Sequence, residues 1–127
     1  MSVFSYIFSA LLLVQSAMAA TECKSAEKNR DGSSKYIIRY YKPNERPGVR
    51  NQFANVQVFE TEKMVTKDYQ PLTFTLCVAK PSGYGIMVRC DSSMGSYSYL
   101  MIENIRNSGA YQDGPFKLFN LACGDLK

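Results

Sequence analysis

The sequence predicts a mainly β domain: a compact antiparallel sandwich or barrel of about six strands, held by two disulfides. Three observations lead to this expectation. Six segments either are rich in β-branched and aromatic residues or alternate apolar with polar residues, and turn-forming residues separate them. No segment has an unambiguous helical pattern. Four cysteines follow an apolar N-terminal segment of the kind that directs export.

The strands are expected where β-forming residues cluster between turns. They span 35–42, 55–61, 72–78, 84–90, 96–103 and 116–123. The clearest alternation lies in 72–78, and a Pro-Ser-Gly turn joins it to 84–90. These two segments therefore predict a β-hairpin.

The segment 96–107 supports two interpretations. Tyr97, Leu100 and Met101 recur at helical spacing, which favours a helix. The apolar residues of this segment also suit a strand, and turn-forming clusters lie on both sides of it. We expect a strand over 96–103.

The first 19 residues are expected to be a cleavable secretory signal. They carry no charged side chain, and an apolar run is followed by Ala-Met-Ala at 17–19. This order is typical of a signal cut after Ala19 or Ala20. A membrane anchor would need about 20 consecutive apolar residues, and Gln15 interrupts the run. We expect a secreted protein with no membrane anchor.

Residues 20–127 should form a single domain with two disulfides, because an even number of cysteines in an exported chain favours pairing. We favour a bond between Cys23 and Cys123, which would fasten both ends of the domain. Cys77 and Cys90 would then close the hairpin. Alternation argues against this second pair, since Cys77 shares a strand face with threonines and Cys90 with apolar residues. A β-bulge would have to intervene.

The composition excludes several kinds of catalysis and metal binding. The chain has no histidine, so it lacks Ser-His-Asp triads and histidine-based ribonuclease chemistry. The cysteines lack the paired spacing of a zinc site. Glu60 and Glu62 are better explained as a solvated strand end. Glu103 and Arg106 are better explained as a surface ion pair worth under about 1 kcal/mol. We expect no enzymatic activity, no cofactor and no metal.

Basic residues are concentrated in the first third of the expected domain, which accounts for the net charge of +4. The segment 35–50 interleaves cations with tyrosines, a combination that single-stranded nucleic-acid binding uses. An ordinary strand with half-buried tyrosines under lysine stems is the simpler interpretation. The expected partner-binding residues are Lys35, Tyr36, Arg39, Tyr40, Lys42, Arg46 and Arg50.

Export, small size, two expected disulfides and missing catalytic residues together resemble the small secreted effectors of plant-pathogenic fungi. The early Cys23 and the late Cys123 are similar to the linked cysteines of ribonuclease-like powdery-mildew effectors. The sequence Asp-Gly-Pro-Phe-Lys-Leu-Phe at 113–119 is similar to their late strand. The motif before the first cysteine differs, because 21–23 reads Thr-Glu-Cys. The six-stranded β-sandwich effectors of the rice blast fungus match the expected strand count.

The resemblance implies a function as well as an alternative fold. The ribonuclease-like group implies an α+β fold with one helix and no catalysis. We expect a monomeric, non-enzymatic virulence effector that binds a host macromolecule, a protein in the first place, and that can be delivered into host cells. The alternatives are a catalytically inactive, ribonuclease-like protein that binds RNA, and a secreted antimicrobial or toxin-like protein.

Overall fold

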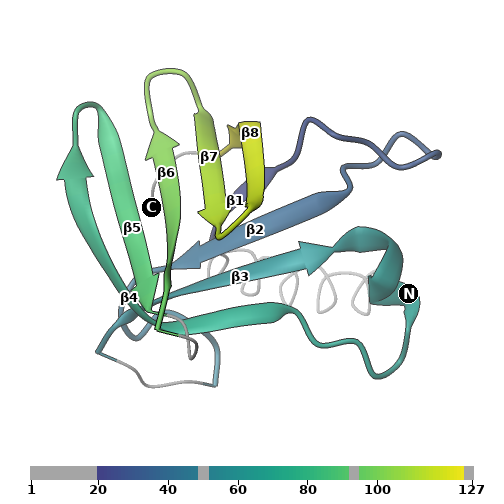
Figure 1. The fold of residues 1–127 in the computed structure, drawn as a ribbon, viewed down its shortest axis with the longest axis horizontal. Helices are drawn as coiled ribbons and strands as arrows, with labels where there is room; N and C mark the ends of the chain where they lie inside the picture. Colours follow the sequence, from purple (N-terminus) through teal and green to yellow (C-terminus); the bar gives the residue numbers. More distant parts are fainter. Residues whose placement is uncertain (1–19, 49–51, 92–94, 125–127) are drawn as a thin grey trace, which may run out of the picture.

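Eight β-strands and one short 3-10 helix make up the fold in the computed structural model, which describes residues 20–48, 52–91 and 95–124 (Figure 1). The expected signal segment and Arg50 lie outside these residues. The elements are β1 (Thr21–Lys24), β2 (Tyr36–Tyr41), β3 (Ala54–Glu60), η1 (Thr61–Val65), β4 (Leu72–Ser82), β5 (Gly85–Asp91), β6 (Tyr97–Glu103), β7 (Ser108–Asp113) and β8 (Phe116–Cys123). No helix within the described ranges is long and apolar enough to cross a bilayer.

The strands form one closed barrel in which each strand pairs with its neighbours in the sequence. Every pairing is antiparallel, and β1 pairs with β8 to close the barrel. The closing ladder is short: it joins Cys23 to Cys123 and Lys24 to Ala122. A mainly β, antiparallel fold with two disulfides is therefore confirmed.

The predicted strand number was wrong, because the described ranges contain eight strands rather than six. The sequence analysis missed β1 and β7. The first is four residues long and adjoins a polar stretch, and the second reads Ser-Gly-Ala-Tyr-Gln-Asp, with few β-forming residues. Pairing on both sides stabilises them in spite of weak local propensity. The ambiguous segment 96–107 contains β6, and the α+β alternative has no α-helix to match it among the described residues.

Two hairpins use two-residue turns that begin with glycine. Gly83 opens the turn between β4 and β5 with a φ of 57°, and Gly114 opens the turn between β7 and β8 with a φ of 58°. A positive φ at the first central position is what type II′ hairpin turns require, and glycine adopts it without a steric cost. Pro115 follows Gly114 at a position where its restricted φ is compatible with the turn.

A β-bulge in β4 resolves the objection to the Cys77–Cys90 pair. The register of β4 against β3 shifts in the part of the strand that contains Thr75 and Leu76, and both of these side chains are exposed. Phe74 and Cys77, on either side of them, are both buried in the core. The extra residue changes which alternate positions face inward, so Cys77 lies on the same face as Cys90.

A second bulge, in β8, orients Cys123 for the disulfide that closes the barrel. The register of β8 against β7 shifts where Phe119 and Asn120 lie, and Asn120 has a φ of 55°. Leu118 before the bulge is buried, and so are Leu121 and Cys123 after it. The bulge therefore turns Cys123 into the barrel.

Both favoured disulfides are present, Cys23–Cys123 and Cys77–Cys90. Each joins residues that are directly paired across neighbouring strands, with 4.0 Å between their Cα atoms. All four cysteines are at most 5% exposed. Two buried disulfides fit an extracellular protein, because the cytosol keeps thiols reduced.

Side chains fill the interior of the barrel, as eight strands allow. The largest fully buried side chains in the described part of the chain are those of Tyr111, Ile38, Leu100, Ile102 and Leu121. The disulfides pack within the same cluster. The core is therefore apolar and covalently linked at two places.

The buried tyrosines make the stability of the fold sensitive to alkali. Burial raises the pKa of Tyr111 far above its usual value of 10.0, and the charge of Asp113 raises it further. Burial and the charge of Glu45 likewise raise the pKa of Tyr40. The folded state holds both phenols neutral, so their contribution to stability is complete below pH 10 and is lost as the pH rises above it. We expect the free energy of unfolding, measured by urea titration, to fall steadily over that alkaline range.

The variant Tyr111→Phe is the control, because it removes one of these titrating groups and keeps the ring. Its stability should decline less steeply with pH than that of the wild-type protein. An equally steep decline in both proteins would contradict this assignment.

Candidate functional site

The tyrosines of the basic segment 35–50 do not form an exposed surface. Tyr40 points into the barrel and is 5% exposed, and Tyr41 is 7% exposed. Tyr36 packs against the core and its ring meets that of Phe116 edge-on, with 5.3 Å between the centroids. These rings are therefore not presented together as a platform on which bases could stack.

Two cations of the segment are paired with carboxylates. Arg39 Nε lies 3.2 Å from Glu22 Oε2, and its guanidinium lies 4.9 Å from the centre of the Phe59 ring. Lys35 Nζ lies 3.6 Å from Glu27 Oε1. These side chains are well exposed, so each ion pair contributes at most about 1 kcal/mol to stability. The pairs nevertheless lower the positive charge that the segment offers to a partner.

The remaining cations of the segment lie apart from these pairs. Lys42 is exposed, and Arg46 is half-buried. Arg46 Nη1 donates a hydrogen bond to Asn55 Oδ1 at 3.3 Å, and Asn55 is 1% exposed although it is polar. This bond ties the connection after β2 to the outside of the barrel. The structure thus distributes the expected binding residues between the core and the outer surface.

A different surface, which the sequence analysis did not single out, covers the outer side of three strands. We call it the β4–β6 face. It consists of Leu76, Val78, Lys80, Met87, Arg89, Tyr97, Tyr99 and Met101. Four of its apolar and aromatic side chains are between 40% and 49% exposed. On β4 these side chains are exposed because the bulge turns Leu76 and Val78 outward.

The strand register brings these side chains next to one another. Val78 is paired with Arg89, and Arg89 with Tyr99, so the three form a row across β4, β5 and β6. The Arg89 guanidinium lies 4.7 Å from the centre of the Tyr97 ring, a cation–π contact that orients it along the face. Arg89 is not part of any ion pair in the described chain, so its positive charge is available to pair with a carboxylate of a partner.

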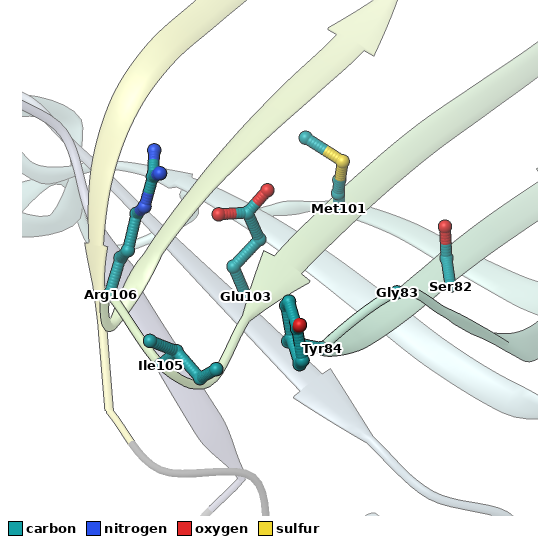
Figure 2. Close-up of a pocket in the computed structure, with 7 residues that line it drawn as sticks. All are labelled: Ser82, Gly83, Tyr84, Met101, Glu103, Ile105 and Arg106. Carbon is teal, nitrogen blue, oxygen red and sulfur yellow. The ribbon is translucent and has the colours of Figure 1, made fainter.

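Two shallow hollows mark this side of the barrel. One, of about 300 Å³, is lined by Val78, Lys80, Pro81, Ser82, Met87, Arg89 and Tyr99. The other, of about 340 Å³, is lined by Ser82, Gly83, Tyr84, Met101, Glu103, Ile105 and Arg106 (Figure 2). The two share Ser82 and therefore adjoin each other.

The second hollow lies between two turns of the barrel end. Tyr84 and Ile105 are 76% and 70% exposed, and the Asn104 N–H donates to the Tyr84 carbonyl at 3.2 Å. Figure 2 shows the side chains of Glu103 and Arg106 pointing to the same side of their turn. The ion pairs of the described chain do not include these two residues, so the ion pair expected between them is not formed. Both charges are thus presented to solvent beside apolar groups.

This arrangement can bind by apolar contact, by cation–π contact and by ion pairing. Among the described residues, no group of three histidine, cysteine, aspartate or glutamate side chains could hold a metal ion. Glu60 and Glu62 also lie elsewhere: Glu60 ends β3 and is paired with Lys63 at 3.3 Å. The chain matches no protein-family model, no curated protein and no solved structure.

Proposed function

We propose that the protein is an exported, non-enzymatic binding protein that recognises a protein partner through the β4–β6 face. The observation that carries the proposal is the row of Val78, Arg89 and Tyr99, exposed beside Leu76 and Tyr97. Tyrosine, methionine and arginine are enriched in protein interfaces. Contiguous exposed apolar side chains on soluble proteins mark interaction surfaces.

The chemistry of the face suits a partner that presents a carboxylate within an apolar patch. Arg89 lies at the centre of the row, where a bound partner would exclude water from it. A charge-assisted hydrogen bond is strongest in such an environment. Lys80 and Arg106 add positive charge nearby, and the net charge of +4 acts in the same direction at longer range.

The proposals that the protein is exported and that its partner is a host protein rest on the sequence and the disulfides rather than on the β4–β6 face. The N-terminal segment is typical of a secretory signal, and the buried disulfides fit an oxidising environment. The missing histidine supports binding rather than catalysis. The resemblance to fungal effectors implies that the partner is a host plant protein. The protein would bind it outside host cells or after delivery into them.

The test compares two matched double variants of the oxidised, mature protein. Arg89→Ala with Tyr99→Ala removes a cation and an aromatic ring from the face. Lys42→Ala with Phe119→Ala removes the same two kinds of group from other exposed positions. Proteins captured from plant tissue are quantified for each form, and the affinity of the captured partner is then measured with purified proteins. We expect the first variant to weaken binding about thirtyfold or more, as for two interface residues that each contribute at least about 1 kcal/mol, and the second to leave it unchanged.

Two results would overturn the proposal. One is a partner whose affinity is insensitive to the first variant, or sensitive only to the second. The other is tight RNA binding with a steep salt dependence, which would favour the nucleic-acid alternative. A protein partner should instead show a shallower salt effect that falls mainly on the association rate.

A further inference from the structure

The mouth of the barrel beside η1 forms a cavity of about 500 Å³ that is separate from the β4–β6 face. It is lined by Val58, Glu60, Lys63, Tyr69, Gln70, Pro71, Leu72, Asp113 and Phe116. In Figure 1, β3 runs into η1 and the chain then returns into β4. Residues of this stretch, from Val58 to Leu72, line one side of the cavity. The hairpin of β7 and β8 forms the other side. Sites for small molecules have this size and often lie in the mouths of β-barrels.

Local contacts hold the walls of the cavity in place. The Glu60 N–H donates to the Tyr69 hydroxyl at 2.8 Å, which fixes the connection after η1 to the end of β3. Because β1 is short, the Tyr36 and Phe116 rings meet beside it and close the gap between β2 and β8. Val58 and Leu72 are paired across β3 and β4 and supply the apolar wall.

The cavity carries one uncompensated negative charge. Lys63 lies 3.3 Å from Glu60 and neutralises it. Asp113 has no ion pair within the described chain, although the protein as a whole is positively charged. A carboxylate at the edge of an apolar cavity attracts a cation more strongly than one in open water, because the local dielectric constant is lower.

Two buried hydroxyls lie next to this carboxylate. Ser98 and Tyr111 are 1% and 2% exposed, and the Ser98 hydroxyl is close enough to the phenol to lower the Tyr111 pKa, against the larger effects of burial and Asp113. Ser98 is paired with Asp113 across β6 and β7, and the Tyr111 ring packs 6.2 Å from that of Phe116. The charge of Asp113 also raises the Tyr111 pKa. The interior beneath the mouth is therefore polar on the side of Asp113.

We propose that the barrel mouth binds a small organic amine, whose ammonium group pairs with Asp113 while its apolar part packs against Val58, Leu72 and Phe116. The ammonium can donate a charge-assisted hydrogen bond to the Asp113 carboxylate. The Phe116 ring adds a cation–π contact. The site shares no residue with the β4–β6 face, so its test is independent of the proposed protein partner.

The experiment titrates the oxidised protein with 2-phenylethylamine and follows the backbone amide signals by NMR. The matched neutral probe is 2-phenylethanol, which replaces the ammonium by a hydroxyl. We expect saturable shifts confined to residues around the mouth, and binding of the amine about tenfold or more tighter than that of the alcohol. Absence of saturable shifts with the amine, or equal affinity for both probes, would overturn the proposal.

Three variants locate the site. Asp113→Asn should abolish the preference for the amine over the alcohol. Leu72→Lys places a competing ammonium in the mouth and should abolish amine binding, whereas Leu76→Lys should not. Leu72 and Leu76 are on the same strand and are 48% and 49% exposed, so the two lysine variants are matched. Equal amine binding by both lysine variants would refute the site, and this comparison stands even where Asp113→Asn does not fold.

Discussion

Replacing Cys23 and Cys123 by alanine should lower the free energy of unfolding by about 4.7 kcal/mol, whereas replacing Cys77 and Cys90 should lower it by about 3 kcal/mol. In the chain-entropy model a disulfide acts by restricting the unfolded chain, more strongly for longer loops. The two bonds span 100 and 13 positions of the sequence. The first loss is comparable to the whole stability of a small domain.

The two double variants control for each other. Both remove a buried cross-strand disulfide and leave two alanines in the same core, so the cavity cost should be similar. The difference of about 2 kcal/mol, measured by urea unfolding, then reports the loop length. Equal losses would contradict the dependence on loop length. They would show that the two ends of the unfolded chain stay close together without the Cys23–Cys123 bond, or that β1 contributes little to stability.

The variant Gly85→Ala should be the most damaging single substitution that adds only one carbon atom. A Cβ at this position would overlap the Ile102 carbonyl oxygen, and it would lie 2.8 Å from the Ile102 carbonyl carbon and 2.9 Å from Glu103 Cα. All of these are backbone atoms of β6, so no side-chain movement can relieve the overlap. We expect a loss of about 3 kcal/mol or more, at the upper end of overpacking effects.

Gly124→Ala is the matched control, because the nearest atom to its added Cβ is a backbone oxygen at 3.9 Å. Its unfolding midpoint should stay close to that of the wild-type protein. A small effect of Gly85→Ala would mean that the β5–β6 hairpin can shift to accept the methyl group. The NMR signals of Met87 and Met101, which are paired across that hairpin, would then move.

Strands with strong local signals could be predicted from the sequence, and those formed through pairing could not. The hairpin of β4 and β5 and the strand β8 follow from alternation and turn residues. The strands β1 and β7 have weak propensity and exist because both of their edges are paired within a closed sheet. Closure is a property of the whole chain, which no local window contains.

The candidate site was missed because alternation alone assigns faces wrongly beyond a bulge. Unbroken alternation through β4 would turn Leu76 and Val78 inward with Phe74. The requirement that Cys77 pair with Cys90 was the available signal for the bulge. A bulge that turns Cys77 inward implies that Leu76 and Val78 face outward. The tyrosines of β2 were predicted to bind a partner because cations lie between them in the sequence. That pattern could not show that the fold buries the rings of Tyr40 and Tyr41.

The closing disulfide also changes what a protease can do to this molecule. With Cys23 joined to Cys123, the intervening chain is a covalent ring, and the Cys77–Cys90 bond divides it into two smaller rings. A single cut in any exposed turn, such as that around Tyr84, opens one ring but releases no fragment. The nicked protein keeps its mass until it is reduced, and the buried sulfur atoms are shielded from reductant while the barrel stays folded. A protease cut in one loop would therefore leave the β4–β6 face attached to the rest of the barrel.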